Sequence, residues 1–110
     1  MEIIESEKFI LLKPNSNSFN EFLSEFESKA NFFKNNHIII DFSENINTKS
    51  PNLYVLLPYS ERHKQLGTSF VIIFNDEFAD DLLEKMDIVP TFTEAKDIIE
   101  MDAISRDLGF

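Results

Sequence analysis

Short apolar runs along the chain predict β-strands. "FILL" from Phe9, "HIIIDF" from His37 and "SFVIIF" from Ser69 are bounded by polar residues, as strands commonly are. The apolar residues of the last two runs are continuous, which favours strands covered on both faces, as in a parallel sheet. "DIVPTF" from Asp87 predicts a short strand at an edge or ending near Pro90, because proline is confined to such places. "EIIE", before the first run, is a candidate hairpin partner for it.

Helical periodicity occupies the segments between these runs. The first predicted helix begins at a capping box formed by Ser18 and Glu21. A short helix is expected at about 77–85, and a last helix from an N-cap at Thr93 to about Leu108, ended by Gly109. In the first helix the apolar residues recur at helical spacing: Phe19, Phe22, Leu23, Phe26, Ala30 and Phe33.

A further helix is predicted from Ser50 to Gly67. Ser50 is a favourable N-cap, Pro51 suits the first helical position, and Gly67 suits the residue after a helix C-terminus. Pro58 lies inside this segment, where proline kinks a helix at a cost of about 3 kcal/mol. We expect a kinked helix; the alternative is a strand at "LYVLL" followed by a helix that begins at Pro58.

Strands that alternate with helices predict the α/β fold class. We expect a mixed, largely parallel sheet of about four strands packed by four helices. The length of 110 residues fits one domain over residues 1–110. No linker, repeat or low-complexity segment divides the sequence.

The composition is that of a globular protein, with 43% hydrophobic and 27% charged residues. The absence of cysteine excludes disulfides and thiolate nucleophiles. The longest apolar runs have five residues, too few to cross a bilayer, and the start of the chain lacks the pattern of a secretion signal. We therefore expect a soluble, cytoplasmic protein.

The charge balance disfavours two classes of partner. A net charge of −10 opposes the phosphates of nucleic acid and the anionic inner leaflet of a membrane. The acidity either serves solubility or steers the protein toward a basic protein partner.

Few residues qualify for chemistry. The two glycines, Gly67 and Gly109, cannot build a glycine-rich phosphate loop. The two histidines, His37 and His63, belong to no paired-ligand motif and are interpreted as surface residues. We therefore expect no catalytic residue, no metal and no cofactor.

The carboxylates show no adjacent base or nucleophile in the sequence. Asp80 with Asp81, and Glu100 with Asp102, are interpreted as parts of a solvated face. Asp41 differs because it ends a central strand, where open α/β sheets place functional loops. Its alternative role is an acceptor that caps the loop.

From His37 onward the order of elements resembles the STAS domain, the fold of anti-sigma-factor antagonists and of the cytoplasmic tails of sulphate transporters. In that family a strand ends in Asp-Leu-Ser, and a helix starts at an Asp-Ser-Ser-Gly-Leu turn. Asp41-Phe42-Ser43 and, at the same offset, Lys49-Ser50-Pro51-Asn52-Leu53 occupy these places here. The ending "EMDAISRDLGF" is similar to small stand-alone STAS-like proteins, some of which carry a ribonuclease Z label.

This resemblance implies a binding switch. In the antagonists a partner kinase phosphorylates the first serine of the turn, and Ser50 falls on that position. A phosphate is accepted at a helix N-terminus because free N–H groups and the helix dipole favour an anion there. Lys49, Pro51 and Asn52 depart from the family pattern, and a plain N-cap role is the alternative for Ser50. The implied switch loop comprises Asp41, Ser43, Thr48, Lys49, Ser50 and Asn52.

The last predicted helix carries an unusually wide apolar band. Ala95, Ile98 and Ile99 mark one stripe, whereas Met101, Ile104 and Leu108 mark a second stripe rotated around the axis. Either the helix breaks near residues 100–102, or its end presents an apolar surface to another chain, or the helix wraps the core. The second alternative makes Met101, Ile104 and Leu108 candidates for a partner or dimer contact.

These observations predict a non-catalytic, cytoplasmic protein-interaction and regulatory domain that resembles anti-sigma-factor antagonists. Its partner is another protein, such as an anti-sigma factor or kinase, or a second copy of the chain. The alternative is a degenerate STAS-like scaffold, or an accessory protein of an RNA-processing enzyme, without a phosphorylation switch. The ribonuclease label implies a His-x-His-x-Asp-His metal motif, which the sequence does not contain.

Overall fold

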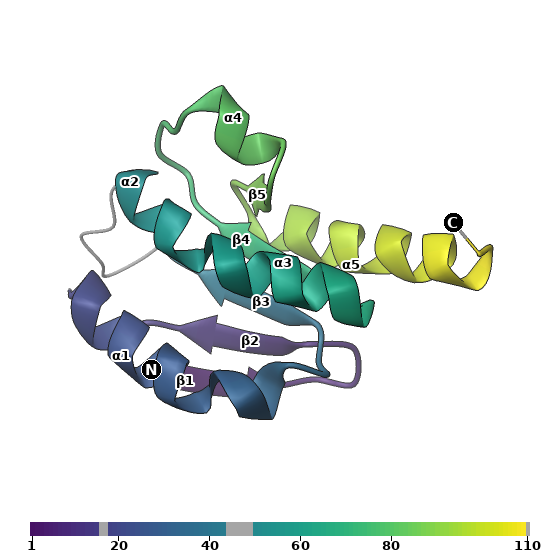
Figure 1. Cartoon of the computed structure of the whole chain (residues 1–110), viewed down its shortest axis with the longest axis horizontal. Coiled ribbons are helices and arrows are strands. Elements are labelled where there is room, and N and C mark those ends of the chain that lie inside the picture. The colour runs from purple at the N-terminus through teal and green to yellow at the C-terminus, as the bar shows by residue number, and fades with distance from the viewer. Residues whose placement is uncertain (16–17, 44–49, 110) are drawn as a thin grey trace.

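The computed structural model describes residues 1–15, 18–43 and 50–109, and it confirms the α/β fold class. One mixed sheet of five strands has the order β1-β2-β3-β4-β5 (Figure 1). β1 pairs with β2 in antiparallel fashion, and the other three pairs are parallel. The strands are β1 (Glu2–Glu5), β2 (Ile10–Lys13), β3 (Ile38–Asp41), β4 (Phe70–Ile73) and β5 (Asp87–Val89).

The sheet has five strands because "EIIE" forms the hairpin strand β1. All four residues of β1 are exposed, so its sequence carries little of the burial pattern that identifies the other strands. The turn between β1 and β2 is held by Ser6, whose hydroxyl oxygen accepts hydrogen bonds from the N–H groups of Lys8 and Phe9, each 3.3 Å long. As expected, β5 lies at an edge and stops just before Pro90.

Helices cover both faces of the sheet. Helix α1, the segment from α2 to α3, and α4 contribute to the core on one face, whereas α5 packs on the other. The helices are α1 (Phe19–Phe33), α2 (Ser50–Leu53), the 3-10 helix η1 (Tyr54–Leu56), α3 (Leu57–Leu66), α4 (Asp80–Leu83) and α5 (Phe92–Asp107).

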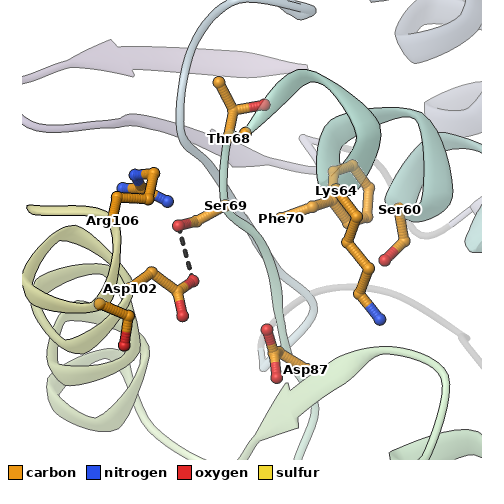
Figure 2. Close-up of a pocket in the computed structure, with 10 residues that line it drawn as sticks. Ser60, Lys64, Thr68, Ser69, Phe70, Asp87, Asp102 and Arg106 are labelled. Carbon is orange, nitrogen blue, oxygen red and sulfur yellow. Dashed lines mark hydrogen bonds between the residues drawn. The ribbon is translucent and has the colours of Figure 1, made fainter. Parts of the chain in front are cut away.

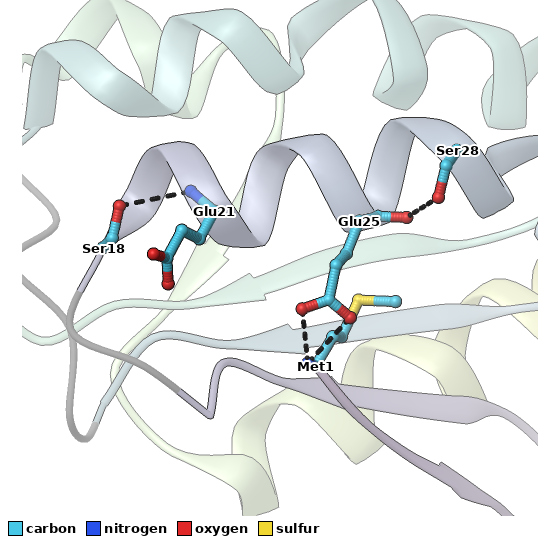
Figure 3. A network of polar contacts seen from close by, with 5 residues as sticks. All are labelled: Met1, Ser18, Glu21, Glu25 and Ser28. Atoms are coloured by element: carbon cyan, nitrogen blue, oxygen red, sulfur yellow. Dashed lines mark hydrogen bonds and ion pairs between the residues drawn. The ribbon is translucent and has the colours of Figure 1, made fainter.

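Helix α1 follows the predicted pattern. The Ser18 hydroxyl accepts a hydrogen bond from the Glu21 N–H at 3.2 Å, as the capping box requires (Figure 3). One turn later the carboxylate of Glu25 pairs with the ammonium group of Met1 at 2.9 Å. The buried residues of α1 are Phe19, Phe22, Phe26 and Phe33, and they pack on Ile10, Leu12, Ile38, Ile40 and Ile72 of the sheet.

The segment after β3 is helical from Ser50 to Leu66, as predicted, but it consists of three consecutive helices rather than one helix kinked at Pro58. α2, η1 and α3 follow one another without a gap, and α3 begins at Leu57 with Pro58 in its first turn. Proline is tolerated there because the first N–H groups of a helix have no partner inside it. In the alternative prediction the strand at "LYVLL" is wrong, but the helix start at Pro58 lies within one residue of the observed start of α3. Gly67 ends α3 with a φ of 78°, in the left-handed region that glycine adopts readily.

Two predicted boundaries are wrong in detail. The short helix α4 spans only Asp80–Leu83 rather than about 77–85. Helix α5 is capped by Thr91 and not by Thr93: the Thr91 hydroxyl accepts from the Glu94 N–H at 3.3 Å. Thr91 with Glu94 completes a capping box, whereas Thr93 is followed three positions later by Lys96, which explains the difference.

The core on the α5 face is small. Ala95 and Ile99 of α5 pack on Leu11, Ile39, Val71 and Ile73 of the sheet. The remainder of α5 continues past the sheet, and the C-terminus lies at its far end (Figure 1). This projecting half of α5 places side chains near the edge at which β3 and β4 begin.

Candidate functional site

At the carboxyl end of β3, Asp41 has the local capping role that was one of its two interpretations. One carboxylate oxygen, Oδ1, accepts hydrogen bonds from the Ser43 N–H, at 2.8 Å, and from the Ser43 hydroxyl. Such bonds turn the chain after a strand. Asp41 and Ser43 are both half-buried.

The rest of the predicted switch loop is only partly described. Thr48 and Lys49 lie outside the described residues, as do the side chains of Ser50 and Pro51. The backbone of α2 begins at Ser50, within one residue of the predicted start, and Asn52 is half-buried in this helix. Phosphorylation of Ser50 stays a prediction.

The second half of α5 exposes the predicted apolar stripe. Helix α5 runs without a break from Phe92 to Asp107, which rules out the alternative of a break near residues 100–102. The side chains of Met101, Ile104 and Leu108 are 61%, 59% and 64% exposed, so this end of the helix does not wrap the core. Positions 101, 104 and 108 lie on one side of a helix because they are separated by three and four residues.

A groove of about 630 Å³ lies beside this stripe. Ile99, Ala103 and Ile104 of α5 form its apolar wall, and Glu7 and Lys8 of the turn before β2 lie opposite. Ile104 therefore belongs to both the stripe and the groove. Together they form one apolar surface on the projecting half of α5.

A polar cluster occupies the edge of the sheet where β3 and β4 begin. The Ser69 N–H donates to Nδ1 of His37 at 2.9 Å, and the Ser69 hydroxyl donates to Oδ2 of Asp102 at 2.7 Å. Arg106, one turn after Asp102, has a guanidinium nitrogen 3.3 Å from Nε2 of His37. Asp102 is half-buried here, so its interpretation as part of a solvated face is wrong.

A cavity of about 310 Å³ adjoins this cluster (Figure 2). It lies between the end of α3 and the second half of α5, next to the start of β5. Ser60 and Lys64 line it from α3, Asp87 from β5, and Asp102 and Arg106 from α5, with Phe70 of β4 between them.

Burial, together with nearby charges, changes the pKa values of Asp87 and His37. Burial raises the pKa of the Asp87 carboxyl; the negative charge of Asp102 adds to this effect, and Lys64 opposes it. Burial lowers the pKa of His37; the positive charge of Arg106 adds to this effect, and Asp102 opposes it. Both shifts favour the neutral form of the side chain.

His63 is a core residue, contrary to its interpretation as a surface residue. Its side chain is 4% exposed, its ring lies 5.2 Å from that of Phe70, and Nδ1 lies 2.7 Å from the Thr68 hydroxyl. Burial lowers the pKa of His63 to about 4, and electrostatic repulsion from His37 and Arg62 acts in the same direction. His63 is therefore neutral at physiological pH and supports the junction between α3 and β4.

Sequence reasoning missed the cavity because its residues are distant in the chain. Ser69 and Asp102 are 33 positions apart, and Ser69 and His37 are 32 positions apart. The available signal was positional: His37 and Ser69 each precede a predicted buried strand, and parallel strands begin at a common edge of the sheet.

A scan against protein-family models finds no match, and a search of the curated proteins returns none. Within the described residues, no group of three or more histidines and carboxylates is placed to hold a metal ion. No helix in this part of the chain has the length and apolar character needed to span a bilayer.

Proposed function

We propose that this protein is a non-catalytic, cytoplasmic interaction domain of the STAS-like type, which binds another protein through the second half of α5. The observation that carries the proposal is the exposed stripe of Met101, Ile104 and Leu108 beside an apolar groove. A helix face of this kind is a common recognition surface when a partner supplies the complementary apolar side chains.

The charge of α5 favours a basic partner over a second copy. Helix α5 contains five acidic residues, Glu94, Asp97, Glu100, Asp102 and Asp107, against the basic residues Lys96 and Arg106. Two copies of the chain, each with a net charge of −10, repel one another. A partner with basic residues around an apolar centre is attracted to this acidic helix. The proposed partner therefore carries lysine or arginine around the apolar side chains that cover Ile104.

Ser50 gives this function a regulatory element. It stands at the first residue of α2, and the resemblance to the antagonists assigns the phosphorylated serine to this position. Helix α2 lies at the end of the molecule opposite to the projecting half of α5 (Figure 1), so a phosphate on Ser50 does not touch the Ile104 surface and acts on a basic partner through the added negative charge of the protein. The expected consequence is a changed affinity with an unchanged fold.

The test compares partner capture by two charge variants. Ile104→Asp introduces a charge into the proposed contact, and Leu83→Asp does so at a similarly exposed site on α4, where Leu83 is 52% exposed. Both variants and the unmodified protein are used to capture partners from native lysate, and circular dichroism verifies that each variant is folded. Phosphopeptide mapping of the bait, the unmodified protein recovered from the lysate, reports the state of Ser50.

We expect one basic protein to bind the unmodified protein and Leu83→Asp, and to be lost with Ile104→Asp. The captured partner must then bind as a purified protein, with an affinity that falls as salt is raised. Equal capture by both variants contradicts the proposed surface. The proposed basic partner is wrong if the unmodified protein forms a dimer, Ile104→Asp dissociates that dimer, and no other protein is captured.

A further inference from the structure

The cavity beside Ser69 lies on an open side of β4. β5 first pairs with β4 at Val71, so Ser69 and Phe70 precede the paired segment. Helices α3 and α5 form the two walls of the resulting slot, and Asp87 lies at its end (Figure 2). The slot therefore offers a protein surface on three sides and a volume of about 310 Å³.

Ser60 is a buried hydroxyl without a hydrogen-bonding partner. Its side chain is 1% exposed, and the part of the chain that the structure describes supplies no hydrogen bond to it. Figure 2 shows its oxygen directed toward the side of the cavity where Lys64 and Asp87 lie. A buried hydroxyl without a partner is costly, so a group that enters the cavity and bonds to Ser60 is favoured.

Asp87 is a carboxylate with unused acceptors at the same cavity. Within the described residues it forms neither a hydrogen bond nor an ion pair through its side chain. The nearby amine of Lys64 donates instead to the backbone carbonyl of Lys85, at 2.9 Å. The second carboxylate, Asp102, accepts from the Ser69 hydroxyl and lies close enough to affect the pKa of Asp87. This end of the cavity therefore attracts a positively charged donor.

Arg106 also lines the cavity, and its N–H groups are not used in hydrogen bonds among the described residues. Nδ1 of His37 accepts the Ser69 N–H, so it carries no proton, and the hydrogen of the ring must be on Nε2. The guanidinium of Arg106 approaches this same Nε2, so two donors face each other and no hydrogen bond forms. Among the described residues Arg106 has no other partner, and its donors are available to an acceptor in the cavity.

We propose that this cavity binds a small zwitterion of the α-amino-acid class, with its ammonium group held by Asp87 and Ser60 and its carboxylate held by Arg106. An ammonium group donates three hydrogen bonds, which suits a carboxylate and a hydroxyl that lack donors. A guanidinium binds a carboxylate through two parallel bonds. The ring of Phe70 provides an apolar wall for the carbon atoms of the ligand.

The charged residues of the cavity favour a zwitterion over a metal ion or an inorganic anion. Asp87 and Asp102 are balanced by Lys64 and Arg106. A metal ion would meet two cations and only two carboxylates, and an inorganic anion would leave Asp87 unpaired. A ligand with one charge of each sign satisfies both ends of the cavity. This site is distinct from the apolar surface around Ile104, so the two proposals fail or succeed independently.

The test uses the twenty standard L-amino acids, each added singly at millimolar concentration to the full chain. Binding is followed by the amide resonances of Ser69 and Phe70 in two-dimensional NMR and by the melting temperature. For any amino acid that binds, two analogues are compared: the amine without the carboxylate, and the N-acetyl derivative without the ammonium group. The variants are Asp87→Asn and Arg106→Gln, with Asp97→Asn, an exposed acid on α5, as the matched control.

We expect at least one amino acid to shift both resonances, and each analogue to bind at least about tenfold more weakly. Asp87→Asn and Arg106→Gln are each expected to weaken binding by about tenfold or more, whereas Asp97→Asn leaves it unchanged. The proposal is overturned if no amino acid binds, if the amine binds as well as the zwitterion, or if the two cavity variants retain full affinity while folded.

Discussion

The two faces of the sheet are covered to different depths. On one face, α1, the α2–α3 segment and α4 bury a core rich in phenylalanine. On the other face, α5 alone covers a smaller core through Ala95 and Ile99, and its second half leaves the sheet. The helices of the thick face mainly build the core, whereas the second half of α5 on the thin face leaves the sheet, forms the cavity together with α3, and carries an exposed apolar surface.

The largest expected effect is on the thick face. Phe26 is almost fully buried, and its ring contacts Tyr59 and Phe70 at centroid distances of 4.9 and 6.2 Å. Phe26→Ala is expected to lower the free energy of unfolding by about 3–5 kcal/mol, because it removes apolar contacts and leaves a cavity. Urea denaturation measures this loss. A loss under about 1 kcal/mol would mean that the thick face is not the main source of stability.

On the thin face, a single buried residue is expected to matter less. Ile99→Ala is expected to cost about 2–4 kcal/mol, because Ile99 is buried against Val71 and Ile73. Ile104→Ala, five positions later on the same helix, is expected to stay within about 0.5 kcal/mol of the unmodified protein. Equal losses for the two variants would show that the second half of α5 also supports the fold.

His63 makes the stability of the thick face dependent on pH. The unfolded chain binds a proton at His63 below about pH 6.5, whereas the folded protein binds it only near pH 4, its pKa being about 4. The free energy of unfolding therefore decreases as the pH falls from 6.5 toward 4. Because each pKa unit corresponds to 1.36 kcal/mol, the total loss is up to roughly 3 kcal/mol. Urea denaturation at several pH values measures the slope. The control His63→Gln is expected to flatten it, and an unchanged slope would refute the assignment.

The smallest expected effect is at Asp87, and it has the opposite sign. Because the pKa of Asp87 is raised in the folded protein, ionisation costs stability as the pH rises through its ordinary value of 3.8 and above. Asp87→Asn is therefore expected to raise the melting temperature slightly at pH 7, and the gain should vanish in acid, where Asp87 is protonated. A lower melting temperature at pH 7 would indicate that Asp87 has a stabilising partner.

Local signals account for what the sequence predicted correctly. The Ser18 cap and the Gly67 terminus each depend on neighbouring residues, and each was found in its expected element, whereas Pro58 begins a new helix instead of kinking a longer one. The continuous apolar runs are also local signals, and they correctly identified the parallel strands β3 and β4. The exposure of Ile104 required the structure, because a wide apolar band does not reveal which side meets the sheet.

The cavity depends on contacts that no local pattern encodes. Ser69 joins His37 and Asp102 across the fold, and burial of Ser60 and His63 follows from where α3 meets β4. Their residue types are common on surfaces, so the sequence interpretation placed His63 there. His37 and Ser69 come together because β3 and β4 pair in parallel and so begin at the same edge of the sheet.

The most direct test of the account is a chain that ends at Glu100, which removes the projecting half of α5. We expect its free energy of unfolding to fall by about 1 kcal/mol, mainly through the lost Ser69–Asp102 hydrogen bond, and its binding to the captured partner to disappear. A shortened chain that is unfolded would contradict the claim that this half of α5 serves binding, and a folded chain that still binds the partner would contradict it as well.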